Sequence, residues 1–254
     1  MKKIKKHFLL FVVGLIIILG LILYVVDTPY RNAQNLIDAI QDQDVERVTA
    51  LLEAGVDPNQ TNAKPSKWWR LVEFSPVRPL TSACETGNLK IIKLLIDYGA
   101  TAEYREYADW SPLRMTLFHC HPDDVEIVEL LLEHGADPSV RESDYTAVFA
   151  AADMYPIPAG SNNSMTDYDT ETAQAITKIV KMLLKDGAVN DQTEYGKTLL
   201  MYAARRGNLY LAEYLIAQGG DISITDSQGK TALDYAVDAQ KQDMVELLLN
   251  HGAE

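Results

Sequence analysis

The chain has 254 residues, of which 47% are hydrophobic and 23% are charged, a balance that excludes a chain disordered throughout. Its formal net charge is −13 at pH 7, so its surface repels the phosphate backbone of nucleic acids. We therefore expect no nucleic acid partner and favour a protein partner with a basic patch, although the same charge also serves solubility.

The first predicted element is a membrane helix. Residues 8–26 form an uncharged apolar run, long enough to cross the roughly 30 Å hydrocarbon layer. A cleavable signal peptide is the alternative, but its apolar region usually has only about 7–15 residues and ends in a small-x-small site, which is missing here.

Four lysines within residues 1–7 favour a cytoplasmic N-terminus. We predict a basic cytoplasmic end (1–7), a transmembrane helix (8–26) and a short tether (27–35) in a single-pass inner-membrane protein, with the rest in the periplasm.

From about residue 36 to the end of the chain, one short phrase returns six times. Each copy is an amphipathic helical run closed by a glycine, which supplies the left-handed backbone that ends a helix. A second phrase lies upstream of these runs, most clearly GKTLLMYAA at residues 196–204 and GKTALDYAV at residues 229–237. Its threonine can cap the helix that follows. A turn and two helices therefore make one unit. The six closing glycines are Gly55, Gly99, Gly135, Gly187, Gly219 and Gly252.

Together the two phrases resemble the ankyrin repeat, which pairs G-x-T-P-L-x-x-A-A with V-x-L-L-L-x-x-G-A-D in a unit of about 33 residues. The resemblance implies an all-α fold, an ankyrin-repeat solenoid of helix-turn-helix units with β-hairpin loops, here preceded by the transmembrane helix. It also implies a protein-binding module, so we expect no enzymatic activity, cofactor, metal or small-molecule substrate. The ankyrin-repeat domain, residues 36–254, divides into about six units: 36–59, 60–103, 104–140, 141–190, 191–223 and 224–254.

Two of these units carry long insertions. One insertion lies between Gln60 and Val77, in the hairpin that joins the first two units, and the other spans residues 154–170. Insertions in repeat proteins decorate one face and are often where function resides.

The predicted partner-binding residues lie at the hairpin tips, which line one edge of a stack of repeats. Tyrosine and tryptophan dominate binding hot spots because they bury a large rigid area at little entropic cost. The resemblance further implies that the residue just before each helix cap faces the partner. The alternative for the two adjacent tryptophans is that they pack on the first unit or rest at the membrane interface. The predicted residues are Trp68, Trp69, Tyr107, Trp110, Tyr145, Tyr195, Lys197 and Lys230.

Cys84 and Cys120, the two cysteines of the chain, lie near the same end of the first helix in neighbouring units, so a disulfide between them is conceivable. The alternative is that Cys84 packs as a buried thiol in a small-residue slot. His119, Cys120 and His121 superficially resemble metal ligands, but adjacent residues point in different directions, so we expect a polar turn there.

These observations predict a membrane-tethered interaction module that binds a partner protein on the extracytoplasmic side. An immunity-type inhibitor of a toxin or an envelope hydrolase fits this design by analogy. The alternative is an accessory or scaffold protein for a periplasmic redox or stress enzyme.

Overall fold

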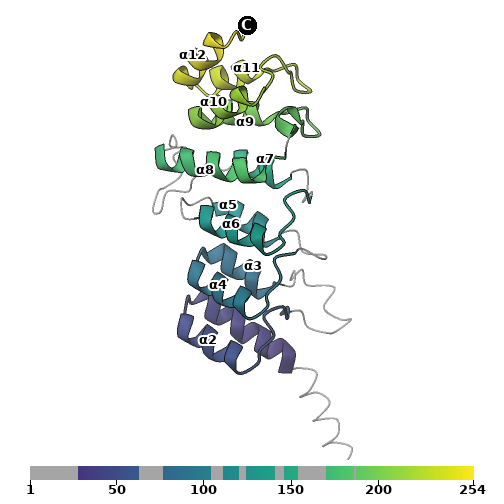
Figure 1. The fold of residues 1–254 in the computed structure, drawn as a ribbon, viewed down its shortest axis with the longest axis vertical. Coiled ribbons are helices and arrows are strands. Elements are labelled where there is room, and N and C mark those ends of the chain that lie inside the picture. The colour runs from purple at the N-terminus through teal and green to yellow at the C-terminus, as the bar shows by residue number, and fades with distance from the viewer. Residues whose placement is uncertain are drawn as a thin grey trace, which may run out of the picture. The chain divides into compact units, whose positions relative to one another are not determined.

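The computed structural model describes residues 28–62, 77–103, 111–119, 124–140, 146–153, 170–185 and 187–254. The chain divides into two compact units, residues 1–100 and 101–254. Every regular element in the described residues is a helix, as Figure 1 shows, and the predicted all-α class is confirmed.

The first unit opens with a helix over residues 28–41. Residues 28–35 were expected to form a tether, but they belong to this helix. The reason is its apolar spacing, because Ala33, Leu36, Ile37 and Ile40 share one face and are almost fully buried. The helices that follow are α2 (Val45–Glu53), α3 (Pro79–Thr86) and α4 (Leu89–Asp97), and α4 packs on both α2 and α3.

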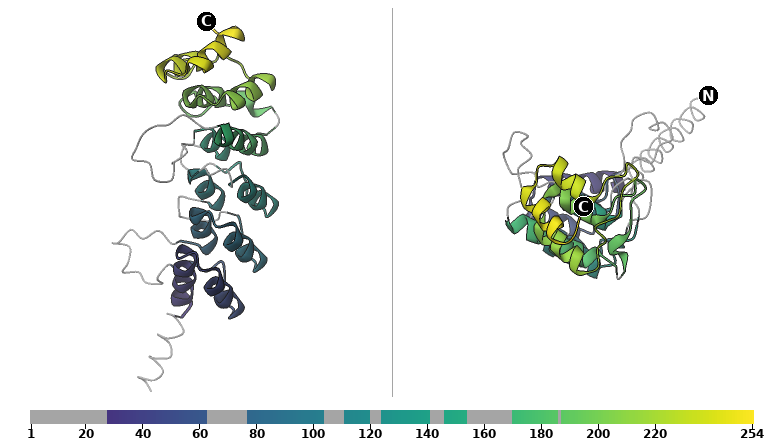
Figure 2. Two further views of the ribbon diagram at one scale, coloured as in Figure 1. Left: turned by 90° about the vertical axis from the view of Figure 1, so that its left-hand side faces the viewer. Right: turned by 90° about the horizontal axis from the view of Figure 1, so that it is seen from above.

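In the second unit, the helices among the described residues form four stacked pairs. Within each pair the two helices contact each other, and α7, α9 and α11 also pack in succession, as do α6, α8 and α10. Figure 2 shows these layers, from teal to yellow, in two further directions. The first helix of each pair thus packs on the first helix of the next pair, and the second helix on the second helix of the next pair. The elements are α5 (Pro112–His119), α6 (Asp124–Glu133), α7 (Ala147–Asp153), α8 (Thr170–Leu183), the 3-10 turn η2 (Ala188–Asn190), α9 (Leu199–Arg206), α10 (Leu209–Ala217), α11 (Ala232–Asp238) and α12 (Gln242–Asn250).

Side-chain caps fix where the first helices begin. The Ser111 hydroxyl accepts the backbone N–H of Arg114 at 3.0 Å at the start of α5. Thr198 caps α9 and Thr231 caps α11 in the same way. The prediction that threonine caps these helices is therefore confirmed for α9 and α11, and Ser111 caps α5 in the same manner. All six closing glycines have φ between +80° and +91°, as helix termination requires.

An asparagine side chain links the end of one repeat to the end of the next. Asn59 Nδ2 donates to the Gly99 carbonyl at 2.8 Å in the first unit. Asn190 Nδ2 donates to the Gly219 carbonyl at 3.1 Å in the second. Because Gly99 and Gly219 hold the same position in their repeats, this bond ties successive repeats in register.

An ion cluster with one buried arginine joins α7 to α9. The Arg206 guanidinium, with only 5% of its side chain exposed, donates to Asp153 Oδ1 at 2.6 Å and to the Asp153 carbonyl at 2.5 Å. Arg205 contacts the same carboxylate, with 31% of its side chain exposed, and its guanidinium lies 5.3 Å from the ring centroid of Tyr202. Burial lowers the pKa of Arg206, and the neighbouring Asp153 carboxylate opposes that effect. Tyr202 is itself buried beside Phe149, so the cluster borders the apolar core.

The predicted membrane helix, residues 8–26, lies outside the described residues. Among the residues that are described, no helix combines the length and the apolar composition that a membrane crossing requires. The 14-residue α8, for example, is shorter than the about 20 residues needed. This finding overturns the predicted location as a single-pass inner-membrane protein with a periplasmic domain, and we do not retain it.

Candidate functional site

The structure describes three of the eight predicted partner-binding residues. Tyr195, Lys197 and Lys230 lie in the loops that precede α9 and α11. The other five lie outside the described residues, so their role stays a prediction: Trp68, Trp69, Tyr107, Trp110 and Tyr145.

The loops before α9 and α11 form two hairpins, residues 191–198 and residues 224–231, which we call the hairpin edge. The first is closed by the Thr193 N–H, which donates to the Lys197 carbonyl at 2.9 Å. The second is closed by the equivalent bond from Asp226 to Lys230, also 2.9 Å long. A third bond crosses between them, from the Ser227 N–H to the Tyr195 carbonyl at 2.9 Å. The backbone therefore fixes both hairpins relative to each other.

The close approach of the two hairpins depends on Gly196. This residue has φ of +76°, and a Cβ added there would lie 3.0 Å from the Ser227 nitrogen and 3.1 Å from the Asp226 Cα. Real Cβ atoms rarely approach backbone this closely, so a side chain would separate the hairpins. Gly229, at φ +77° in the second hairpin, has open space where its Cβ would be.

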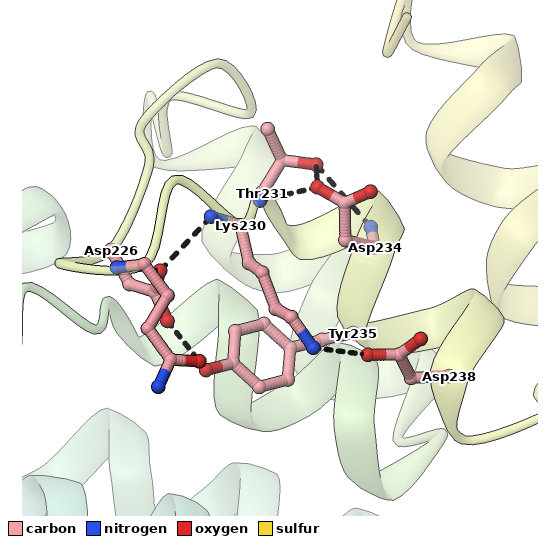
Figure 3. Close-up of polar contacts among 7 residues, drawn as sticks. Asp226, Lys230, Thr231, Asp234, Tyr235 and Asp238 are labelled. Carbon is pink, nitrogen blue, oxygen red and sulfur yellow. Dashed lines mark hydrogen bonds and ion pairs between the residues drawn. The ribbon is translucent and has the colours of Figure 1, made fainter.

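A network of polar side chains extends from the second hairpin onto α11, as Figure 3 shows. The Tyr235 hydroxyl donates to Asp226 Oδ2 at 2.6 Å. Asp226 Oδ1 accepts the backbone N–H groups of Gln228 at 2.8 Å and Lys230 at 2.9 Å. Lys230 Nζ pairs with Asp238 Oδ2 at 2.6 Å. Asp226 therefore holds the shape of the hairpin, and Tyr235 holds Asp226.

Both predicted lysines converge on the ring of Tyr235. Lys197 Nζ lies 5.4 Å from the ring centroid and Lys230 Nζ lies 5.9 Å from it. A cation within about 6 Å of an aromatic ring is attracted to its face. Tyr195, two residues before Lys197 in the first hairpin, has 54% of its surface exposed. The hairpin edge thus presents one exposed ring and two positioned ammonium groups.

The titration behaviour of the network follows from these contacts. Burial and the hydrogen bond to Asp226 raise the pKa of Tyr235 to about 12. Burial alone would raise the pKa of Asp226, but the hydrogen bonds from Tyr235, Lys230 and Gln228 outweigh it and lower the pKa. At neutral pH the tyrosine therefore keeps its proton and the aspartate is ionised, which is the arrangement that the hydrogen bond between them requires.

Tyr235, Asp226 and Asp238 belong to this surface but were not predicted from the sequence. A signal for Asp226 existed, because Asp three residues before Gly229 is typical of a tight turn. Tyr235 stands four residues after Thr231, one helical turn into α11, and its neighbourhood depends on how α11 packs against the hairpins. No sequence signal distinguishes Asp238 from the other acidic residues of the chain.

The remaining predictions concern the two cysteines and the histidine turn. Cys84 is buried in α3, while Cys120 lies outside the described residues, so their pairing stays a prediction. α5 ends at His119 and α6 begins at Asp124, and residues 120–123 between them, including His121, are not described. Elsewhere in the described ranges, no three His, Cys, Asp or Glu side chains lie close enough to hold a metal ion.

The family model for ankyrin repeats, in three copies, matches residues 36–142 and 172–254. The chain therefore belongs to the ankyrin repeat family. Ankyrin repeats are protein–protein interaction modules and are generally not enzymes.

Viral and animal relatives share this repeat. The fowlpox virus protein FPV230, named for its ankyrin repeats, is 27% identical over 208 residues, which cover 82% of this chain and 94% of the viral protein. A second fowlpox virus ankyrin repeat protein, FPV244, is 35% identical over 74 residues, 29% of this chain and 11% of that protein. The human NAD-capped RNA hydrolase NUDT12 is 45% identical over 49 residues, 19% of this chain and 11% of the hydrolase. The chain thus spans about a tenth of the last two proteins, and the similarity to the hydrolase covers only a fifth of this chain.

A solved structure shares the fold. It is the complex of the predatory endopeptidase Bd0816 from Bdellovibrio bacteriovorus with the immunity protein Bd3460, in which one chain superimposes with a TM-score of 0.61. The match has 23% sequence identity and covers 85% of this chain and 97% of that chain. At this identity the likeness concerns the fold.

Proposed function

We propose that this chain binds a partner protein through the hairpin edge and thereby inhibits it, as an immunity-type protein directed at a toxin or an envelope hydrolase. The observation that carries the proposal is the convergence of Lys197 and Lys230 on the Tyr235 ring, on hairpins that also carry the exposed Tyr195. Exposed aromatic rings and cations on a fixed backbone lose little entropy when they bind.

The charge of the surface favours a partner with mixed polarity. Lys197 and Lys230 can pair with carboxylates of the partner, while Asp238, whose side chain is 57% exposed, can accept a basic group. The chain as a whole carries −13, so a basic patch on the partner strengthens the encounter at long range. We therefore expect the association rate to fall as salt concentration rises.

The inhibitory direction is an analogy with the endopeptidase–immunity complex whose fold is shared. A repeat module without its own catalytic groups can alter an enzyme by covering its active site. The same module could instead support an enzyme, which was the alternative raised by the sequence, so the test must separate the two directions.

The test is a paired affinity capture with the full chain from cells that carry its gene. One bait is the wild-type chain, and the other carries Tyr195→Ala and Lys230→Glu. Because both side chains are exposed, we expect the variant to fold normally, which circular dichroism checks. A protein retained by the wild type and lost from the variant is the partner.

The captured partner is then purified and its activity is measured with and without the chain. Inhibition that the variant fails to produce supports the proposal. An increase in activity favours the accessory role, and a partner that both baits retain equally rules out the hairpin edge as the binding surface.

A further inference from the structure

A groove lies between α8 and α10, which are second helices of their repeats, whereas the hairpin edge precedes the first helices. Its volume is about 460 Å³. We call it the outer-helix groove. Its lining residues are Gln174, Thr177, Lys178, Lys181, Tyr210, Glu213 and Tyr214.

One wall of the outer-helix groove is unusually apolar for an exposed helix. α10 (LYLAEYLIA) contains a single charged residue, Glu213. Its inner face buries Leu211 and Leu215, while Tyr210 on the outer side is 42% exposed. A helix that is apolar on all sides normally has neighbours on all sides. By comparison, α12, the second helix of the next repeat, carries two acidic residues, Asp243 and Glu246, and is therefore more polar than α10.

The other wall is a basic ridge. Lys178 and Lys181 are exposed and lie three residues apart, so they share one face of α8, and the exposed Lys185 follows just after the helix ends. Lys181 Nζ lies 4.6 Å from the ring centroid of Tyr214, which fixes this ammonium beside the aromatic wall. In a chain of net charge −13 the ridge is a local reversal of sign.

We propose that the outer-helix groove is a second docking site, independent of the hairpin edge, and that it accepts an acidic amphipathic helix of a partner protein. The apolar side of such a helix covers Tyr210 and Tyr214, and its carboxylates pair with Lys178 and Lys181. A helix fits better than a strand because the groove lies between two helices and offers no sheet edge to extend. Glu213 on the α10 wall repels the carboxylates of the partner helix. The acidic side of that helix must therefore face α8.

The probes are two fluorescein-labelled peptides of about 18 residues, or five helical turns. They share one apolar stripe and differ only at the polar positions, which are glutamate in one and lysine in the other. Fluorescence anisotropy measures the affinity of each for the full chain at low and high salt. We expect the acidic peptide to bind more tightly than the basic one, and salt to weaken its binding.

The decisive variant reverses two charges of the ridge, Lys178→Glu with Lys181→Glu. The matched control reverses Lys90 and Lys93 on α4, which have the same spacing, the same exposure and the same change in net charge. We expect the ridge variant to lose about tenfold or more in affinity for the acidic peptide, and the control to lose little. Tyr210→Ala should also weaken binding, which separates contact with the groove from general charge attraction.

The proposal is overturned if the two peptides bind alike, or if the ridge variant loses no more affinity than the control. A variant that reverses Lys197 and Lys230 tests independence from the proposed function. It should lose the captured partner and keep the acidic peptide, while the ridge variant keeps the hairpin-bound partner.

Discussion

The hairpin edge and the α7–α9 junction are both held together by charged side chains, but they differ in burial. At the junction, Arg206 is 5% exposed and bonds to Asp153. At the hairpin edge, Lys230 is 41% exposed and bonds to Asp238. Breaking a buried ion pair is costly because it leaves a desolvated charge, whereas an exposed pair exchanges its partner for water. The junction is therefore suited to fixing the stack, and the hairpin edge to exchanging partners.

The largest effect is expected at the junction. Arg206→Met removes the buried guanidinium that bonds to the Asp153 carboxylate and carbonyl, so the free energy of unfolding should fall by about 3 kcal/mol, the upper end of the range for hydrogen bonds to charged groups. Arg205→Met is the matched control, because Arg205 contacts the same carboxylate but is 31% exposed, and it should cost about 1 kcal/mol or less. Urea denaturation followed by circular dichroism measures both. Equal losses would mean that burial is not what distinguishes the two arginines.

An intermediate effect is expected where the two hairpins touch. Gly196→Ala forces a non-glycine residue to φ +76° and places its Cβ against the backbone of the second hairpin. We expect a loss of about 2–3 kcal/mol, at the upper end of the cost of a strained backbone conformation.

Gly229→Ala is the control for this substitution, because it has the same backbone conformation and no nearby atoms. It should cost about 1 kcal/mol, since it adds strain without a clash. The same urea titration compares the two variants. A Gly196 variant as stable as the Gly229 variant would show that the hairpins can separate freely.

The smallest effect is a shift in titration at the hairpin edge. The pKa of Tyr235 is raised to about 12 in the folded chain, compared with about 10 when unfolded. Its contribution to stability is therefore complete below about pH 10 and is lost as pH rises through the folded value. Ultraviolet absorbance of tyrosinate should show a late-titrating component that Tyr235→Phe lacks. Identical titrations of the two proteins would contradict the bond from Tyr235 to Asp226.

At acidic pH, the stability that the same network contributes changes with pH in the opposite direction. The pKa of Asp226 is lowered, so its contribution is present above the unfolded value, about 4, and is lost as pH falls through the folded value. Tyr235→Phe removes one donor, so we expect the variant to lose less stability than the wild type on acidification. Urea denaturation at a series of acidic pH values measures this difference, and parallel losses would argue against the network.

The sequence predicted what depends on neighbours along the chain. The closing glycines and the caps at Ser111, Thr198 and Thr231 are local features, and the structure confirms them. The repeating phrase was enough to identify the family. The helical residues 28–35 were missed because the threonine-led phrase is missing from the start of the first unit, although Ala33 and Leu36 carry the helical period.

Features that depend on packing between distant segments could not be read from the sequence. Arg206 and Asp153 are separated by the insertion and by α8, so no spacing rule connects them. Tyr235 reaches Asp226 because α11 packs against its own hairpin, and Lys197 reaches the same ring from the previous repeat. The predicted membrane location is wrong for a different reason, because no helix among the described residues is long and apolar enough to cross a membrane.

The most direct test of the proposed hairpin edge is hydrogen–deuterium exchange of the full chain, alone and with the captured partner. We predict slower exchange at residues 191–198 and 224–231 in the complex, because the partner covers both hairpins. Protection confined to α8 and α10, with exchange at the hairpins unchanged, would contradict the account.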